Sequence, residues 1–407
     1  MTAFSLMLLH ATAGWAQESH TPRLIFNGFG TLGLVHSSED QADFVSDIFD
    51  PNGAGHSNDL SPEVDSRLGL QLTAEITPDL SAFGQIIFEQ RYDGTYKPKL
   101  EWANIRYDIT RRLSARAGRM VLPAFLTSEY RNVGYALPWI RPPLEVYRLL
   151  PVSSADALSL AYRFRAGDFN NTLQALYGRR DLDFPAPDSG EVQSRDLVTL
   201  AYTLERGATT FFGSYSASRL TVEAFEPLFD GFRQFGPPGE AIAERFGVDD
   251  KRSAIISAGA RYDPGEWFVM GELARSTNQS VLADSHGMYV SGGYRFGSFT
   301  PYLTLARVDV DSDTSTPGLP LEGLPPPLAG LAQGLNAGLN DLLGLSPAQK
   351  SVSLGTRWDF APNFALKLQL DHMDIDKGSP GFLIDRQPGF QPGGTVSLFS
   401  ASLDVVF

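Results

Sequence analysis

A short pattern closes alternate runs of residues along the chain: an aromatic residue beside an arginine, followed by a turn. Its copies are Arg106-Tyr107-Asp108, Tyr162-Arg163-Phe164, Arg261-Tyr262-Asp263, Tyr294-Arg295-Phe296 and Arg357-Trp358-Asp359-Phe360. In each copy the aromatic residue has the same parity as the aliphatic residues before it, whereas the arginine has the opposite parity. Because successive side chains of a β-strand point to opposite faces, the apolar face of each strand ends in aromatics. Such a level of aromatics is typical of a transmembrane β-barrel at the membrane interface.

Alternation with a period of two is the main evidence for the strands. In the run that begins at Ser351, the side chains of Val352, Leu354 and Trp358 share one face, and Arg357 lies on the other. Runs of this kind predict sixteen strands, near residues 24–35, 64–76, 81–92, 99–109, 112–120, 156–165, 169–180, 195–205, 207–218, 251–263, 266–276, 286–297, 298–309, 349–360, 363–374 and 395–407. The connections alternate between short turns and longer loops, as in an antiparallel barrel with both termini on one side.

Outer-membrane barrels have short periplasmic turns and long extracellular loops. The aromatic–arginine pattern falls on the side of the short turns in every copy, so we interpret it as the periplasmic girdle. The expected girdle residues are Tyr107, Tyr162, Phe164, Tyr262, Tyr294, Phe296, Trp358 and Phe360.

Composition excludes a bundle of membrane-spanning helices, which is the main alternative fold for a membrane protein. The 407 residues are 43% hydrophobic and carry a formal net charge of −14, with no run of about 18–20 apolar residues that a membrane helix would need. A β-propeller would repeat with a fixed blade period, which the unequal loops here lack. A secreted β-sandwich would not need sixteen strands with one lipid-like face. The sequence therefore predicts an all-β fold, a transmembrane antiparallel barrel of 16 strands.

The N-terminal stretch of the sequence carries features of an exported protein. Ala3–Leu9 is a short apolar stretch, and Gly14-Trp15-Ala16 places small residues at the two positions that determine cleavage. We therefore expect residues 1–16 to be a signal peptide and residues 17–407 to be a single barrel domain. The absence of Cys fits passage through an oxidising periplasm.

Several motifs resemble those of Gram-negative porins of the general, trimeric superfamily. Ser66-Arg67-Leu68-Gly69-Leu70 looks like the second strand of such porins, Ala117-Gly118-Arg119 like the strand that leads into their constriction loop, and the terminal Phe407 like an outer-membrane assembly signal. The resemblance implies an outer-membrane location, a homotrimer, contact with outer-membrane lipid and lipopolysaccharide, and insertion by the barrel-assembly machinery. The stretch after Ser128 lacks the Pro-Glu-Phe-Gly-Gly pattern of enterobacterial porins.

A barrel of sixteen strands leaves an aqueous lumen, which needs a constriction to filter solutes. The long segment 121–155 is expected to fold inward as that constriction loop, and 219–250 and 310–348 are expected to be long external loops with helical segments. The loop would contribute Glu129, Arg131, Arg141, Glu145 and Arg148 to the narrowest section. The opposite wall would contribute Arg67, Arg91, Arg116 and Arg119. Arg119 points outward by strict parity, so its place in the pore requires a break at Gly118, as the porin resemblance implies.

The resemblance implies passive diffusion of small hydrophilic solutes and ions. The third loop carries three Arg against two Glu and the expected wall residues are basic, which favours weak selectivity with a preference for anions. A substrate-specific channel of the same fold is the alternative. We expect no enzymatic activity, no cofactor, no metal and no nucleic-acid partner. A barrel hydrolase would need a partner for His372, and none stands at a suitable spacing. The carboxylates at 309–313 and 371–376 are interpreted as solvated rims.

Overall fold

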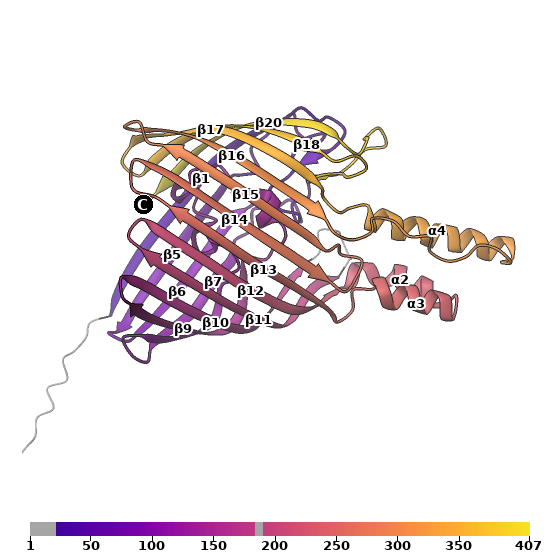
Figure 1. Cartoon of the computed structure of the whole chain (residues 1–407), viewed down its shortest axis with the longest axis horizontal. Coiled ribbons are helices and arrows are strands. Elements are labelled where there is room, and N and C mark those ends of the chain that lie inside the picture. The colour runs from indigo at the N-terminus through magenta and orange to yellow at the C-terminus, as the bar shows by residue number, and fades with distance from the viewer. Residues whose placement is uncertain (1–21, 184–189) are drawn as a thin grey trace, which may run out of the picture.

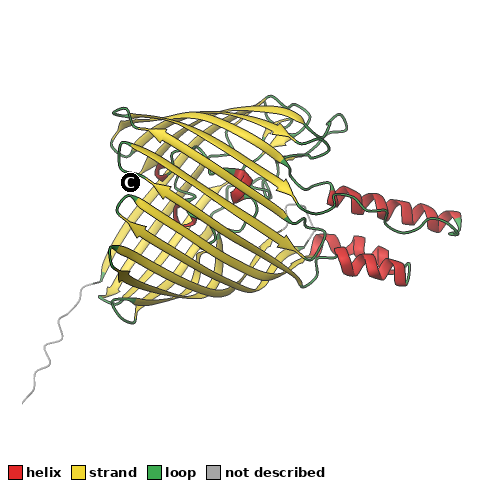
Figure 2. Ribbon diagram, viewed as in Figure 1, coloured by secondary structure: helices red, strands yellow, loops and turns green. Residues whose placement is uncertain are grey.

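The protein is described by a computed structural model that covers residues 22–183 and 190–407 (Figure 1). The expected signal peptide lies outside the described residues. Sixteen long strands form one closed antiparallel barrel, which confirms the predicted fold class (Figures 1 and 2). They are β1 (Arg23–Ser37), β5 (Arg67–Thr77), β6 (Leu80–Glu89), β7 (Lys99–Asp108), β8 (Leu113–Val121), β9 (Ser154–Ala166), β10 (Phe169–Asp183), β11 (Glu191–Arg206), β12 (Thr209–Val222), β13 (Lys251–Tyr262), β14 (Trp267–Asn278), β15 (Ser285–Tyr294), β16 (Phe299–Val310), β17 (Gln349–Ala361), β18 (Phe364–Ile375) and β20 (Gly394–Val406).

The barrel closes where its first strand pairs with its last. Thr31 of β1 stands opposite Asp404 of β20 on one side and opposite Arg67 of β5 on the other. The last residue extends this closure, because Phe407 N donates to the carbonyl of Gly28 at 3.0 Å and Gly28 N donates back at 2.8 Å. Within the described residues, each of the sixteen barrel strands is paired on both sides, which is a condition for spanning a membrane with β-structure.

The remaining elements lie in the long loops, which are numbered in chain order: the first joins β1 to β5, the third β8 to β9, the fifth β12 to β13, the seventh β16 to β17 and the eighth β18 to β20. The short strands β2 (Asp43–Phe44), β3 (Ala54–Gly55) and β19 (Leu383–Ile384) form a small sheet, and β4 (Leu60–Ser61) pairs with β1. The third long loop holds η1 (Ser128–Tyr130), η2 (Gly134–Ala136) and α1 (Leu144–Tyr147). The fifth and seventh long loops hold η3 (Glu223–Phe225), α2 (Glu226–Arg233), α3 (Pro237–Phe246) and α4 (Pro326–Leu343), and α2–α4 project together beyond the barrel (Figures 1 and 2). None of the helices in the described part of the chain is long and apolar enough to cross a membrane.

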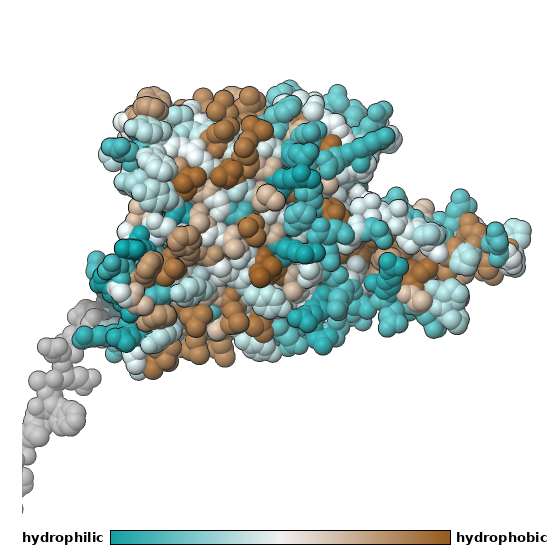
Figure 3. Space-filling view, in the orientation of Figure 1, coloured by the Kyte–Doolittle hydropathy of each residue, from teal (hydrophilic) through white to brown (hydrophobic). Residues whose placement is uncertain are grey.

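The two faces of the barrel wall differ as the alternation predicts. On the outer face Leu354 is 59% exposed and Leu370 is 50% exposed, and apolar residues of this kind form the brown areas on the barrel surface in Figure 3. On the inner face Gln369 is 5% exposed and Lys367 is completely buried. The inner side of the wall at β18 is therefore covered by protein and not by solvent.

We predict that Leu368→Arg, on the outer face of β18, destabilises the barrel by about 2–4 kcal/mol if the residue lies near the midplane of the membrane. The control is Thr73→Arg, because Thr73 of β5 is half-buried on the inner face, away from lipid. Urea unfolding of both variants in lipid vesicles measures the difference. Equal destabilisation by the two arginines would contradict the assignment of the faces.

Candidate pore constriction

The third long loop lies inside the barrel, packed against one part of its wall. Leu126 N donates to the carboxylate of Glu272 on β14 at 2.8 Å. The indole N–H of Trp139 donates to Ser291 of β15 at 2.8 Å and to Thr304 of β16 at 3.0 Å, and Trp139 is only 1% exposed. The loop thus folds into the lumen, as predicted, and lies beside β14–β18. Open space remains towards β5–β10 and, on the side nearer the short turns, at Arg261 and Arg357.

Two cations on the wall hold backbone carbonyls of this loop. Lys367 Nζ donates to the carbonyl of Gly134 at 2.6 Å and to that of Trp139 at 2.7 Å. Arg357 of β17 donates to the carbonyl of Tyr135 and lies over its ring, 4.6 Å from the centroid. Hydrogen bonds from charged donors are stronger than those between neutral groups, so the loop is fixed in one position.

Arg141 and Glu145, which were expected to line the constriction, instead anchor the loop to the wall. Arg141 is 6% exposed and forms ion pairs with Asp65 and Asp371, at 2.5 Å and 3.1 Å. Glu145 is 4% exposed and accepts a hydrogen bond from Ser351 of β17 at 2.7 Å. Both charges are paired with groups of the protein, and Arg141 at the same time lines the cavity described next.

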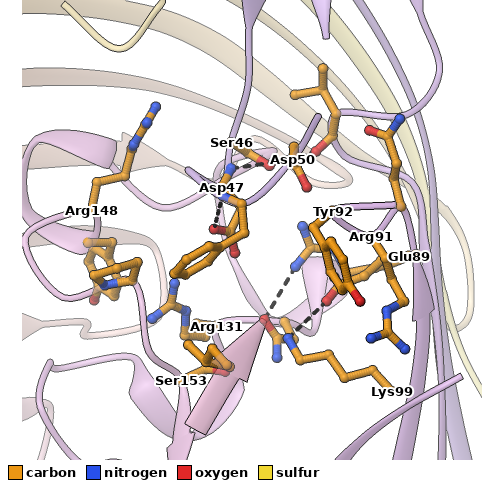
Figure 4. A pocket seen from close by; sticks show the side chains of 18 of the residues that line it. Ser46, Asp47, Asp50, Glu89, Arg91, Tyr92, Lys99, Arg131, Arg148 and Ser153 are labelled. Carbon is orange, nitrogen blue, oxygen red and sulfur yellow. Dashed lines mark hydrogen bonds and ion pairs between the residues drawn. The ribbon is translucent and has the colours of Figure 1, made fainter. Parts of the chain in front are cut away.

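A cavity of about 360 Å³ lies beside the anchored loop (Figure 4). It is lined by the first long loop, by the third long loop and by the inner faces of β5–β7 and β10. The charged residues around it include Asp47, Asp50, Glu63, Glu89, Arg67, Arg91, Lys99, Arg131, Arg148 and Arg180. Positive and negative groups thus face each other across a narrow space, which is the arrangement that orients dipolar solutes and filters ions in a pore.

Four of these cations have no carboxylate within ion-pair distance among the described residues. They are Arg67, Arg131, Arg148 and Arg180. Arg67 donates only to the side chain of Asn132, at 3.3 Å, and Arg131 lies over the ring of Tyr147. Their charge is therefore not cancelled by direct contact and acts on the cavity.

Arg148 is the most constrained of the four. Its guanidinium donates to the carbonyls of Val45 and Phe382, at 3.2 Å and 3.1 Å, and lies over the ring of Phe382. Burial lowers its pKa to about 10, so it remains charged at neutral pH. The residue joins the third loop to both the first and the eighth long loops.

The first long loop contributes carboxylates that sequence reasoning missed. Asp47 N donates to the carboxylate of Asp50 at 3.2 Å, and both side chains line the cavity (Figure 4). Burial, together with the nearby charges of Asp47 and Glu89, raises the pKa of Asp50 well above its ordinary value. The only available signal was the length of segment 36–63, since long loops in compact folds are usually functional. Its inward fold depends on pairing between β2 and β19, which are far apart in sequence.

The other predicted pore residues lie in different surroundings. Arg116 faces the lumen beside the ring of Phe83, 5.7 Å from its centroid. Arg91 lies at the cavity, where Asp183 approaches its guanidinium to 3.6 Å. Glu129 of the third loop is exposed, and its charge acts on Arg116. These residues therefore do not converge on one narrow ring.

Arg119 keeps its outward parity in β8 without the expected break at Gly118, and it still lines the cavity beside the third loop. Gly118 has a φ of +117°, yet the pairing of β8 with β7 and β9 continues through it without a shift of register. Arg119 stands opposite Asp156 and donates two hydrogen bonds to it, at 2.8 Å and 2.7 Å. A change of backbone torsion without an inserted residue leaves the alternation intact.

The residues of the aromatic–arginine pattern make contacts on both faces of the wall. Outside, the aromatic rings contact one another, as for Tyr294 and Phe296 with centroids 4.5 Å apart. Inside, the arginine of three copies pairs with an aspartate two residues later, as for Arg106 with Asp108 and Arg357 with Asp359, each at 2.7 Å. Arg261, Arg295 and Arg357 line a second cavity of about 250 Å³ on the side of the loop nearer the short turns. The aspartate of the pattern was visible in the sequence, but its partner was not recognised.

His372 has a neighbour that sequence spacing did not reveal. Its Nδ1 lies 3.1 Å from the hydroxyl of Ser397, which stands opposite it on β20. No carboxylate contacts the imidazole within the described residues. A nucleophilic serine needs a base that a third group orients, so this pair has no catalytic arrangement.

Comparisons with known proteins agree on the architecture. No protein-family model and no curated protein sequence matches the chain. Among solved structures, it is similar to Salmonella typhi OmpF in complex with daunomycin, at 14% identity and a TM-score of 0.56, over 94% of this chain and 97% of that one. It is also similar to the outer-membrane channel DcaP of Acinetobacter baumannii, at 11% identity and 0.53, over 95% and 97%. A trimer form of Vibrio cholerae OmpT gives 12% identity and 0.52, over 95% and 100%.

The chain has the sixteen-stranded porin fold. At these identities the similarity concerns the fold alone, and it does not extend to the side chains that line the cavity.

Proposed function

We propose that the protein is an outer-membrane channel through which small hydrophilic solutes and ions diffuse passively. The observation that carries the proposal is the charged cavity held open between the anchored third loop and the wall at β5–β10. The closed barrel can lie in a membrane because its outer face is apolar. The buried ion pairs fix the third loop, so the width of the channel stays constant. No catalytic role is proposed for any residue.

The narrowest section is proposed to be formed by cations of the third loop and wall and by carboxylates of the first loop. Arg67, Arg131 and Arg148 would supply the positive side, and Asp47 would supply the negative side. Because burial favours the neutral form of Asp50, the balance favours anions. We also propose a homotrimer that is inserted by the barrel-assembly machinery through the closure at Phe407.

Recordings in planar lipid bilayers test the channel function. We expect discrete conductance steps from the purified protein and a reversal potential in a salt gradient that indicates a weak preference for anions. Protein that inserts into the bilayer as a folded barrel but conducts no current would contradict the proposal. A substrate-specific channel would be recognised by competitive block of the current by one class of solute.

The charge of the third loop should set the selectivity. We predict that Arg131→Glu moves the reversal potential towards cation preference, because this charge faces the cavity without a carboxylate partner. The control is Arg386→Glu in the eighth long loop, which makes the same change of charge at an exposed position. Solvent ions screen exposed charges within about 8 Å at physiological salt, so the control should have the smaller effect. A larger shift from Arg386→Glu would place selectivity at the mouth.

A further inference from the structure

One copy of the aromatic–arginine pattern has no aspartate to neutralise its arginine. In three copies the arginine pairs with the aspartate two residues later, and Arg295 of a fourth copy pairs with Asp263 of the copy before it. In the copy on β9, the residue two positions after Arg163 is Arg165. Arg165 donates to the carbonyl of Gly167 in its own turn, at 3.1 Å. Among the described residues, no carboxylate lies within ion-pair distance of either arginine.

The neighbouring strand does not supply the missing negative charge. Thr172 of β10 stands opposite Arg163, and Asn170 stands opposite Arg165, so both cross-strand neighbours are neutral. Tyr162 is 41% exposed on the outer face, and alternate residues of a strand share a face, so both arginines lie on the inner side. The inner face of β9 therefore ends in two uncompensated cations at the mouth of the lumen nearer the short turns.

The adjacent strand β8 adds two more cations on the same side of the barrel. Arg112, immediately before β8, is exposed, and its carbonyl accepts a hydrogen bond from the backbone N–H of Arg163 at 2.7 Å. The two residues therefore leave neighbouring strands at the same level. Arg116 faces the lumen four residues further along, roughly 13 Å away at about 3.3 Å per residue. Glu129 of the third loop acts on Arg116 from beyond ion-pair distance.

These four residues, which we call the exit arginines, are Arg112, Arg116, Arg163 and Arg165. They are not among the residues that line the cavity beside the third loop. Arg119, which does line it, lies three residues beyond Arg116 along β8, on the side of the third loop. The exit arginines are therefore a separate group, nearer the short turns. Cations gathered on one wall of a water-filled passage raise the local concentration of anions, and the fork of a guanidinium matches the oxygens of a phosphate or carboxylate.

We propose that the exit arginines bind soluble anions that carry several phosphate or carboxylate groups, on the short-turn side of the third loop. The inference rests on the proposed channel function and adds a second binding site beyond the constriction. An anion with a single phosphate reaches only one level of the group. A chain of phosphates or carboxylates reaches both the level of Arg163 and that of Arg116, so it binds more tightly.

The test measures binding of inorganic tripolyphosphate to the purified full-length protein by isothermal titration calorimetry. Orthophosphate at the same ionic strength is the comparison, and we expect it to bind more weakly. Arg163→Gln and Arg165→Gln should each weaken the binding of tripolyphosphate by about tenfold, the scale expected for loss of a hydrogen bond to a charged group. Equal affinity of the wild type and the R163Q/R165Q variant would refute the site.

Two control variants locate the binding. Arg206→Gln removes the same charge at the same end of the barrel, where Arg206 is paired with Asp168 at 3.5 Å, and should leave the affinity unchanged. Loss of affinity in Arg131→Gln but not in R163Q/R165Q would place the anion at the constriction and overturn the proposal.

The stability of the variants and the current are measured separately from binding. Urea unfolding should show the same midpoint for R163Q/R165Q and the wild type, because both side chains are exposed. The single variants, each of which removes one exposed cation, keep the test decisive if the double variant fails to fold. Protein that binds tripolyphosphate at the exit arginines but conducts no current would contradict the channel function and leave the site standing.

Discussion

Replacement of Arg141 by leucine should destabilise the folded barrel by about 3–5 kcal/mol, because it leaves the buried carboxylates of Asp65 and Asp371 without their cation. The same change should release the third loop from the wall. We expect a larger and noisier single-channel conductance, since Arg141 joins the loop both to the first-loop segment at Asp65 and to β18 at Asp371. Urea unfolding and bilayer recordings on one preparation measure the two effects together.

The control for this variant is Arg131→Leu, made on the same loop. Arg131 lines the cavity without a carboxylate partner, so its removal should change selectivity and leave stability nearly unchanged. If Arg141→Leu left the conductance unchanged while lowering stability, the ion pairs would serve folding only. Destabilisation of less than 1 kcal/mol would show that the pairs are open to solvent.

The strands of this fold were predictable because each depends on local alternation. All sixteen were located, and the side chains of Leu354, Leu368 and Arg357 lie on the expected faces. Alternation repeats every two residues, and neither long loops nor remote contacts alter it. A helical segment was also expected in the seventh long loop, where α4 lies with Leu339 buried.

The constriction was less predictable, because its geometry depends on contacts between distant segments. Arg141 and Arg131 look alike in the sequence, yet one is buried between two carboxylates and the other faces the cavity. Asp65 and Asp371, which decide this difference, lie in other parts of the chain. The inward fold of Asp47 depends likewise on pairing between the first and eighth long loops. The sequence predicted that the third loop folds inward, but a pattern of residue types cannot tell which wall strands the loop covers.

The third loop approaches the wall so closely at Gly134 that this position has no room for a side chain. A Cβ at this position would lie 2.2 Å from the carboxylate of Asp404 and 2.5 Å from the hydroxyl of Thr31. The absence of a side chain lets the loop carbonyl reach Lys367, whose ammonium lies 3.0 Å from Asp404. The glycine, the lysine and the aspartate thus form one contact between the loop and the closure of the barrel.

Replacement of Lys367 by methionine should destabilise the barrel by about 3–5 kcal/mol, because Asp404 would keep a buried charge without a cation. Both side chains are completely buried, so solvent cannot compensate. The double variant Lys367→Met with Asp404→Asn should recover part of this loss, since asparagine is neutral and still accepts the hydrogen bond from Thr31. It should not recover all of it, because the carbonyls of Gly134 and Trp139 lose their donor. Unfolding midpoints of the wild type, both single variants and the double variant give the coupling directly, and additive effects of the two changes would mean that the buried charge is not the cause.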